Sequence, residues 1–292
     1  MTNRYIEKIH KVIDYISENT NKQISVKELA DLAGFSQYHF HRIFTAYTGE
    51  PLSSFVKRVR LEKSASCLIY ADTNITEVAL TYGYDTPSAY TKAFKQLFGV
   101  NPSKYKTIKS NIIAVEKESE EHNQRRRIIM ENFIGIKDLG NLKVISVRKT
   151  GKYSDSANEA WNSLCKFAYS KSVGQSDKII TPESKFIGIG YDNPCVTAEE
   201  NLRYEACITV DKDIQTEGEV FKNEIPGGKY AVFLHKGPYD SLMQTYNAIF
   251  TEWLPNNPYK LRDLPCFEMY LNRNPKMTKP ENLRTEIYIP LE

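Results

Sequence analysis

Two segments in the first third of the chain repeat one pattern, and this repeat limits what the chain can fold into. VKELADLAGFSQYHFHRIFTAYTGEPLSSFVK occupies residues 26–57, and ITEVALTYGYDTPSAYTKAFKQLFGVNPSKYK occupies residues 75–106. Each copy predicts a short helix, a turn at Gly34 or Gly83, and a second helix. A helix-turn-helix of this kind places its second helix in the major groove of DNA.

The matched positions are those that pack a helix pair together. Ala30 and Ala79 are small at the point where two helices must cross closely. Three large apolar positions also recur in the two copies: Phe40 matches Tyr90, Phe44 matches Phe94, and Phe55 matches Tyr105. We therefore expect the two copies to have the same core.

Residues that cap helices stand where these helices should begin. Ser25 followed by Glu28 predicts a capping box at the first short helix. Ser36 and Asp85 are the predicted N-caps of the two second helices. Pro87 fits the first turn of the later one, where proline is tolerated.

The segment between the copies predicts one helix over residues 51–71, which would span roughly 30 Å. That length is close to one turn of B-DNA, about 34 Å, so the two second helices could reach consecutive major grooves. Residues 1–110 contain 15 basic and 10 acidic residues, whereas residues 131–292 contain 20 and 22. The basic excess lies in the part of the chain that carries the repeat, which favours nucleic acid as its partner.

Residues 3–110 resemble the DNA-binding domain of AraC/XylS-family transcription regulators, through ELADLAGFSQYHFHRIFTAYTGEPLSSFVKRVRLEKS and the second copy quoted above. The resemblance implies base contacts from Tyr38, His41 and Arg42, and an Arg can bond guanine through two hydrogen bonds. The outward residues of the second helix are small, so we expect mainly phosphate contacts there. The residues predicted to contact DNA are Gln37, Tyr38, His41, Arg42, Thr86, Ser88, Lys92 and Lys95. The alternatives are a solvated helix face and an architectural protein that binds DNA with little sequence preference.

A charged segment at 111–129 predicts a linker, because its charges form blocks with little apolar periodicity. Five cysteines stand singly, which predicts reduced thiols and no metal site. No apolar run reaches the length of a membrane-spanning helix, and the pattern of residues 1–20 predicts an amphipathic helix rather than a signal peptide. We expect a cytoplasmic protein without a cofactor.

The rest of the chain, residues 130–292, contains a second repeat. VISVRKTGKYSDSANEAWNSLCKFA at 144–168 parallels YAVFLHKGPYDSLMQTYNAIFTEWL at 230–254, and a strand, a loop and another strand follow each. The predicted fold class is multidomain: an all-α N-terminal domain over 1–110, and an α+β domain of two β-α-β-β repeats around a pseudo-twofold axis and a shared groove. Glu205 and Glu286 recur at matching positions, which favours a structural role for both.

One acid breaks the second repeat. In the strand pattern LPCFEMYLN, Glu268 stands among apolar and aromatic residues, and its counterpart in the first half is about Ile189. A buried carboxylate without a partner is unfavourable until a cation replaces the lost water. Aromatic walls would stabilise that cation further.

Residues 130–292 resemble the GyrI-like effector-binding domain, through GGKYAVFLHKGPYDSLMQTYNAIFTEWLP, LPCFEMYLN and ENLRTEIYIPLE. The resemblance implies a ligand cleft between the halves, in which a glutamate meets lipophilic cations, and Glu268 is at the matching position. The residues predicted to line the ligand site are Glu268, Tyr270, Trp161, Tyr153, Tyr191 and Tyr239. Together the two resemblances predict a transcription regulator, expected to be an activator, with double-stranded DNA, a small-molecule effector and RNA polymerase as its partners.

Three alternatives remain open at this point. Glu268 could pair with a cation such as Arg273 and be structural. Glu268 and Tyr270 could catalyse hydrolysis of small electrophilic substrates, as is implied for some GyrI-like domains, with the carboxylate as general base. The domain could also bind a protein. Fusion to a DNA-binding domain favours sensing over turnover, because a consumed ligand signals poorly, so we do not expect an enzyme.

Overall fold

The computed structural model describes residues 3–71, 73–117, 127–129, 131–171, 179–194, 196–273 and 275–292. The chain divides into two compact units, Met1–Glu118 and Ser119–Glu292, and each is described by itself. Residues 118–126 of the predicted linker at 111–129 lie outside the described residues. The last helix of the first unit continues to Lys117, past the predicted end of the DNA-binding domain at 110 and into the predicted linker.

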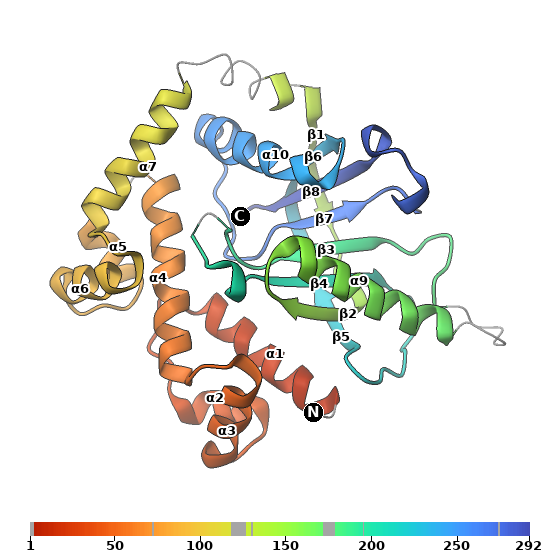
Figure 1. Cartoon of the computed structure of the whole chain (residues 1–292), viewed down its shortest axis with the longest axis horizontal. Helices are drawn as coiled ribbons and strands as arrows, with labels where there is room; N and C mark the ends of the chain where they lie inside the picture. The colour runs from red at the N-terminus through yellow and green to blue at the C-terminus, as the bar shows by residue number, and fades with distance from the viewer. Residues whose placement is uncertain are drawn as a thin grey trace. The chain divides into compact units, whose positions relative to one another are not determined.

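The described part of the first unit is helical (Figure 1). Its helices are α1 (Asn3–Glu18), α2 (Val26–Ala33), α3 (Gln37–Thr48), α4 (Leu52–Tyr70), α5 (Ile75–Thr81), α6 (Pro87–Phe98) and α7 (Pro102–Lys117). The predicted pair of helix-turn-helix motifs is confirmed as α2–α3 and α5–α6, and α4 is the helix that joins them. No helix within the described ranges is long and apolar enough to cross a membrane.

The two motifs have the same turn and the same core contact. Gly34 and Gly83 end the first helix of each motif with φ of 62° and 76°, in the left-handed region that favours glycine. The Phe44 and Phe55 rings lie 5.3 Å apart edge to face, and the matching pair, Phe94 and Tyr105, has the same separation. The repeat read from the sequence is thus a repeat of three-dimensional packing.

Two predicted caps were wrong in detail. Ser25 accepts a hydrogen bond from the Glu28 amide, but the Glu28 carboxylate accepts one from the Tyr15 hydroxyl instead of closing the box. A reciprocal capping box forms instead at Asn74 and Glu77, in the second copy. The N-cap of α6 is Thr86, not Asp85, since Pro87 occupies the first helical position.

The second unit contains one eight-stranded antiparallel sheet in the order β1-β6-β8-β7-β3-β4-β2-β5 (Figure 1). The strands are β1 (Phe133–Leu139), β2 (Leu142–Thr150), β3 (Phe186–Gly190), β4 (Arg203–Thr209), β5 (Phe221–Ile225), β6 (Gly228–Lys236), β7 (Phe267–Tyr270) and β8 (Arg284–Pro290). The order is symmetric about the β7–β3 pair, which agrees with the predicted pseudo-twofold axis.

Each half contains one strand more than the predicted β-α-β-β unit. β1 precedes the first repeat in the chain but pairs with β6 of the second, and β5 precedes the second repeat but pairs with β2 of the first. The halves therefore exchange their outer strands. This exchange makes the two repeats one folding unit with a continuous sheet.

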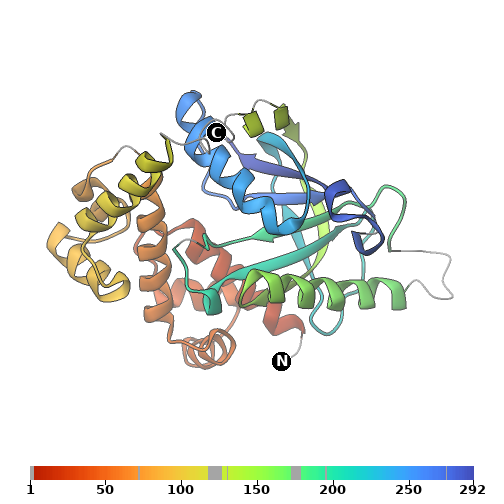
Figure 2. The ribbon, with the colours of Figure 1, turned by 45° about the horizontal axis from the view of Figure 1, so that its top comes forward.

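Both major helices of this unit lie on the same face of the sheet (Figure 2). α9 (Tyr153–Ser170) packs on β2 and β4, and α10 (Leu242–Ala248) packs on β6 and β8. A π-helical turn, Ile249–Trp253, and a 3₁₀ turn, Leu254–Asn256, extend α10. The opposite face has its own core, which includes Ile187, Ile189, Phe267 and Tyr288. The central strands β7 and β3 therefore lie between the two helix-covered cores.

Candidate functional site

The predicted DNA-contacting residues are on the exposed faces of α3 and α6. Both helices bury their aromatic residues: Phe40, Phe44, Tyr90 and Phe94 have no exposed surface. The opposite faces present Gln37, His41, Arg42, Thr86, Ser88, Lys92 and Lys95, which are all exposed. The side chain of Tyr38 lies outside the described ones. Thr86 has a structural role as well, because its hydroxyl caps α6 by accepting from the Ala89 amide at 3.1 Å.

In the sheet unit, Glu268 lies on the face that the helices cover. Its β-sheet neighbours form a row across the six inner strands: Phe233, Ile287, Glu268, Gly188, Ala206 and Val147. The outer members pack under α10 on one side and under α9 on the other. Glu268 is the one charged residue of the row, and Gly188, directly opposite it, is the one without a side chain.

Two tyrosine hydroxyls bind the Glu268 carboxylate. Tyr246 of α10 donates to Oε1 at 3.2 Å, and Tyr270, two residues along β7, donates to Oε2 at 2.6 Å. Within the part of the chain that the structure describes, no basic side chain forms an ion pair with Glu268. Burial raises the pKa of Glu268, and the two hydroxyl donors oppose that rise only in part.

Aromatic rings surround the Tyr270 ring. Trp161 of α9 and Tyr239, from the short 3₁₀ helix Tyr239–Ser241 before α10, each meet it edge to face, with centroids 5.8 Å and 5.3 Å away. The Trp161 indole N–H donates to the Tyr204 hydroxyl at 3.0 Å, and the hydroxyls of Tyr204 and Tyr270 are 2.9 Å apart. Burial raises the pKa values of Tyr204, Tyr246 and Tyr270 above the usual 10, so these hydroxyls remain protonated donors at neutral pH.

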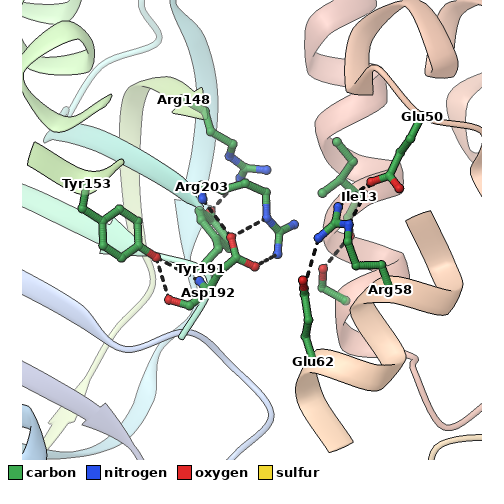
Figure 3. A network of polar contacts seen from close by, with 10 residues as sticks. Ile13, Glu50, Arg58, Glu62, Arg148, Tyr153, Tyr191, Asp192 and Arg203 are labelled. Atoms are coloured by element: carbon green, nitrogen blue, oxygen red, sulfur yellow. Dashed lines mark hydrogen bonds and ion pairs between the residues drawn. The ribbon is translucent and has the colours of Figure 1, made fainter. Parts of the chain in front are cut away.

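Tyr153 is fixed at the edge of this cluster. Its hydroxyl donates to the Asp192 carbonyl at 2.7 Å and accepts from the Asp192 amide at 3.1 Å (Figure 3). Arg203 holds the Asp192 carboxylate through its guanidinium, at 2.6 Å and 2.9 Å. The Tyr153 ring meets Tyr204 with centroids 6.2 Å apart. The structure thus brings Glu268, Tyr270, Trp161, Tyr153 and Tyr239 together.

The placement of Tyr191 with these residues was wrong. Its hydroxyl donates to Glu205 at 2.9 Å and accepts from Arg148 at 2.6 Å, in a buried network on the other face of the sheet. The predicted counterpart of Glu268 was wrong for a related reason. Ile189 pairs with Phe267 and belongs to the opposite core, and the residue facing Glu268 is Gly188. Arg273 does not pair with Glu268 either, since it donates to the carbonyls of Thr181 and Pro182.

The sequence interpretation missed two residues of the site, Tyr204 and Tyr246. A signal for Tyr204 was present, because strand alternation places it on the face opposite Glu205. Tyr246 is the one aromatic residue of α10, and its direction depended on how that helix rotates against the sheet. No sequence pattern states that rotation.

Two protein-family models match separate parts of the chain. Residues 133–292 match the model of the GyrI-like small molecule binding domain, and residues 29–108 match a helix-turn-helix domain. The Bacillus subtilis protein named "Uncharacterized HTH-type transcriptional regulator YbfP" is 33% identical over 116 residues, which cover 39% of each chain. The "HTH-type transcriptional activator AarP" of Providencia stuartii is 28% identical over 98 residues, 34% of this chain and 73% of AarP. In a solved EcmrR–DNA complex, EcmrR is 18% identical with a TM-score of 0.49, over 91% of this chain and 98% of EcmrR.

The duplicated helix-turn-helix unit and the sheet unit that follows it in the sequence define a class: a bacterial AraC-type DNA-binding transcription regulator with a small-molecule-binding domain. Within that class, the chain belongs to the GyrI-like family, whose model matches more than half of its length.

Proposed function

We propose that this regulator senses a lipophilic cation, which binds at Glu268 on the sheet face between α9 and α10. One observation carries the proposal: the Glu268 carboxylate lies among aromatic rings with tyrosine hydroxyls, and no described basic side chain, as its partners. A cation would supply the missing counter-charge, and the rings would add about 0.5–2 kcal/mol per contact when desolvated. The ligand regulates only if it binds two states of the protein with different affinity.

Calorimetry of the full chain with tetraphenylphosphonium tests this proposal. We expect the wild type to bind and Glu268→Gln to bind at least about tenfold more weakly, which corresponds to about 1.4 kcal/mol. The matched control is Glu286→Gln, because Glu286 is on the neighbouring strand β8 but contacts Lys137 instead of the aromatic cluster. Equal affinity in the wild type and Glu268→Gln would refute the assignment.

For the DNA-binding unit, we propose that α3 and α6 enter two consecutive major grooves of an asymmetric site in an activated promoter. The exposed polar faces of the two helices and the 19-residue helix α4 between the motifs support this geometry. A cytoplasmic location and a contact with RNA polymerase follow from that role, and the match to an activator supports the sign of regulation.

Footprinting and quantitative binding test the DNA proposal. Arg42→Ala should weaken binding by roughly 1–3 kcal/mol and relax the base preference at one position. Lys92→Ala should weaken all sequences about equally and reduce the salt dependence. Protection of a single groove would contradict the use of both helices.

A second candidate activity rests on the 2.6 Å contact between Tyr270 and Glu268, because a carboxyl group with a raised pKa beside a hydroxyl donor can act as a general base. Incubation with small electrophilic esters, followed by product analysis, tests it. Product formation that Glu268→Gln abolishes would support hydrolysis over sensing alone.

A further inference from the structure

A directed chain of hydrogen bonds connects α9 to the carboxylate of Glu268. The Trp161 indole N–H donates to Tyr204, the Tyr204 hydroxyl lies 2.9 Å from that of Tyr270, and Tyr270 donates to Glu268. An indole N–H is only a donor, and Tyr270 has spent its one proton on Glu268. The Tyr204 hydroxyl must therefore donate to Tyr270, so each bond in the chain has one direction.

Gly188 makes the meeting of the two hydroxyls physically feasible. A Cβ atom built on Gly188 would overlap the hydroxyl oxygens of both Tyr204 and Tyr270. Gly188 needs no left-handed backbone, because its φ lies outside the region that disfavours other residues. The two tyrosine hydroxyls occupy the space that a side chain at position 188 would need, which explains the glycine there. Gly188 is directly opposite Glu268 in the sheet.

The members of this chain come from both halves of the domain. Trp161 is on α9, Tyr204 on β4 and Gly188 on β3, all in the first repeat, whereas Tyr270 and Glu268 are on β7 of the second. Among the described residues, no acid of the first repeat hydrogen-bonds to Tyr204 or Tyr270. The first repeat instead supplies Tyr204, which hydrogen-bonds to the Tyr270 hydroxyl, and Tyr270 donates to Glu268.

We propose that Gly188, Tyr204 and Trp161 are positioning residues, which keep the Tyr270 hydroxyl on Glu268 and thereby set how strongly the site attracts a cation. Donors in series polarise one another, so the bond to the carboxylate is strengthened by those behind it. A carboxylate with a stronger donor keeps its charge to lower pH. The part of this inference that concerns ligand affinity rests on the proposed function, and the part that concerns the carboxyl group does not.

Two variants should break the series of hydrogen bonds from Trp161 to Glu268 without removing any aromatic ring. Gly188→Ala should push the hydroxyls of Tyr204 and Tyr270 apart, and because these are the ends of long side chains the fold has room to adjust. Tyr204→Phe removes the middle hydroxyl and keeps the ring. Gly140→Ala is the matched control, since no described atom other than those of residue 140 and its chain neighbours lies within 4 Å of its added Cβ.

A measurement without ligand tests the chain first. The protein has two tryptophans, so tryptophan-labelled protein gives two indole N–H signals in an NMR spectrum, and Trp161→Phe identifies the one from Trp161. We expect the Trp161 signal to shift with pH as Glu268 titrates, and the shift to vanish in Glu268→Gln. Its midpoint should move to higher pH, or the shift should be lost, in Gly188→Ala and Tyr204→Phe, but not in Gly140→Ala. A Trp161 signal that ignores pH in the wild type, or titrates identically in Gly188→Ala, would overturn the proposal.

Binding of tetraphenylphosphonium to the full chain, measured between pH 5 and pH 8, tests the consequence for affinity. Gly188→Ala and Tyr204→Phe should each bind about tenfold more weakly near the lower end of this range, the size expected when a hydrogen bond to a charged group is weakened. The double variant should lose no more than the stronger single one, because both act through Tyr270. Unchanged affinity in both variants, with a wild type that binds, overturns the positioning role. A wild type that does not bind refutes the proposed function, and the indole titration then decides the positioning chain independently.

Discussion

The two repeats of the sheet unit share one framework and differ in how they treat buried charge. Glu205 of the first repeat and Glu286 of the second occupy the third position of β4 and β8. Glu205 forms an ion pair with Arg148 at 2.6 Å, and these side chains are 0% and 3% exposed. Glu286 pairs with Lys137 at 3.2 Å, where the lysine is 37% exposed. Both repeats thus have a glutamate with a basic partner at this position, but only the partner of Glu205, Arg148, is buried.

At the centre of the sheet the contrast is reversed. There the first repeat has Gly188 and the second has Glu268, whose partners are hydroxyls. One repeat thus pairs its buried charge with a fixed guanidinium, and the other leaves its charge without a basic partner among the described residues. A duplicated framework can therefore keep the same paired acid in both copies, Glu205 and Glu286, and place a further buried acid, Glu268, in only one of them.

The largest effect is expected where the enclosed pair is broken. Glu205→Gln leaves the Arg148 guanidinium buried without its counter-charge, which should lower the free energy of unfolding by about 3–5 kcal/mol. Glu286→Gln should lower it by less than about 1 kcal/mol, because its lysine is partly solvated. Both tryptophans are in the sheet unit, so urea unfolding followed by tryptophan fluorescence reports on this unit. Similar losses in the two variants would remove the contrast between the repeats.

The next largest effect on the free energy of unfolding is expected for Glu268→Gln, which should stabilise the sheet unit. Burial raises the pKa of Glu268 above its ordinary value, so the folded state binds the proton more tightly than the unfolded state does. The stability of the folded state therefore falls as pH rises from the ordinary glutamate pKa through the raised one. Glu268→Gln should therefore raise the free energy of unfolding near neutral pH by roughly 0.5–2 kcal/mol, a size common for single stabilising substitutions. The gain should shrink as pH falls to the ordinary glutamate pKa.

Glu205 supplies the matched comparison for that pH profile. Burial alone would raise its pKa, but Arg148 and the surrounding donors lower the pKa below the usual range. Its stabilising contribution is therefore present above the ordinary pKa and lost as pH falls through the lowered value. Unfolding measured from pH 3 to pH 8 should show opposite slopes for the two substitutions, and parallel profiles would contradict the assignment of charge states.

Local patterns predicted most of the fold. The helix-turn-helix pair followed from two copies of one spacing, and Glu268 was found because a charge stood in an apolar strand. The exchange of β1 and β5 could not be predicted, because pairing partners of edge strands are set by contacts between distant segments. Short strands without a strong alternation, such as Phe221–Ile225, give little signal of their own.

The errors in the site have a common cause, which is the unknown register between elements. The sequence similarity of the two repeats matches Glu268 to Ile189, one residue away from Gly188, and a shift of one residue along a strand changes the face of the sheet. Tyr191 was predicted to line the ligand site because it is aromatic. It follows Gly190, however, and its side chain lies on the face of the sheet opposite the helices. Tyr204 was readable from alternation with Glu205, whereas the direction of Tyr246 required the packing of α10.

A smaller effect on stability is expected at Tyr204 and its counterpart in the second repeat, Thr285. Both are the second residue of their strands, and both side chains lie on the helix-covered face. The Tyr204 hydroxyl has two partners, whereas the Thr285 Oγ1 is buried with none among the described residues. A buried hydroxyl without a hydrogen bond is unfavourable, and replacing it by a methyl group of the same shape removes that penalty.

Thr285→Val should therefore raise the free energy of unfolding by about 1 kcal/mol, and Tyr204→Phe should lower it by about the same amount. The same urea titrations measure both, and the shape of each side chain is nearly preserved, so packing changes little. A loss of stability in Thr285→Val would show that the hydroxyl has a partner, such as a bound water, and that the second repeat has its own polar network. A gain would show that the Thr285 hydroxyl has no partner, whereas the Tyr204 hydroxyl at the matching position reaches the Tyr270 hydroxyl on the central strand β7.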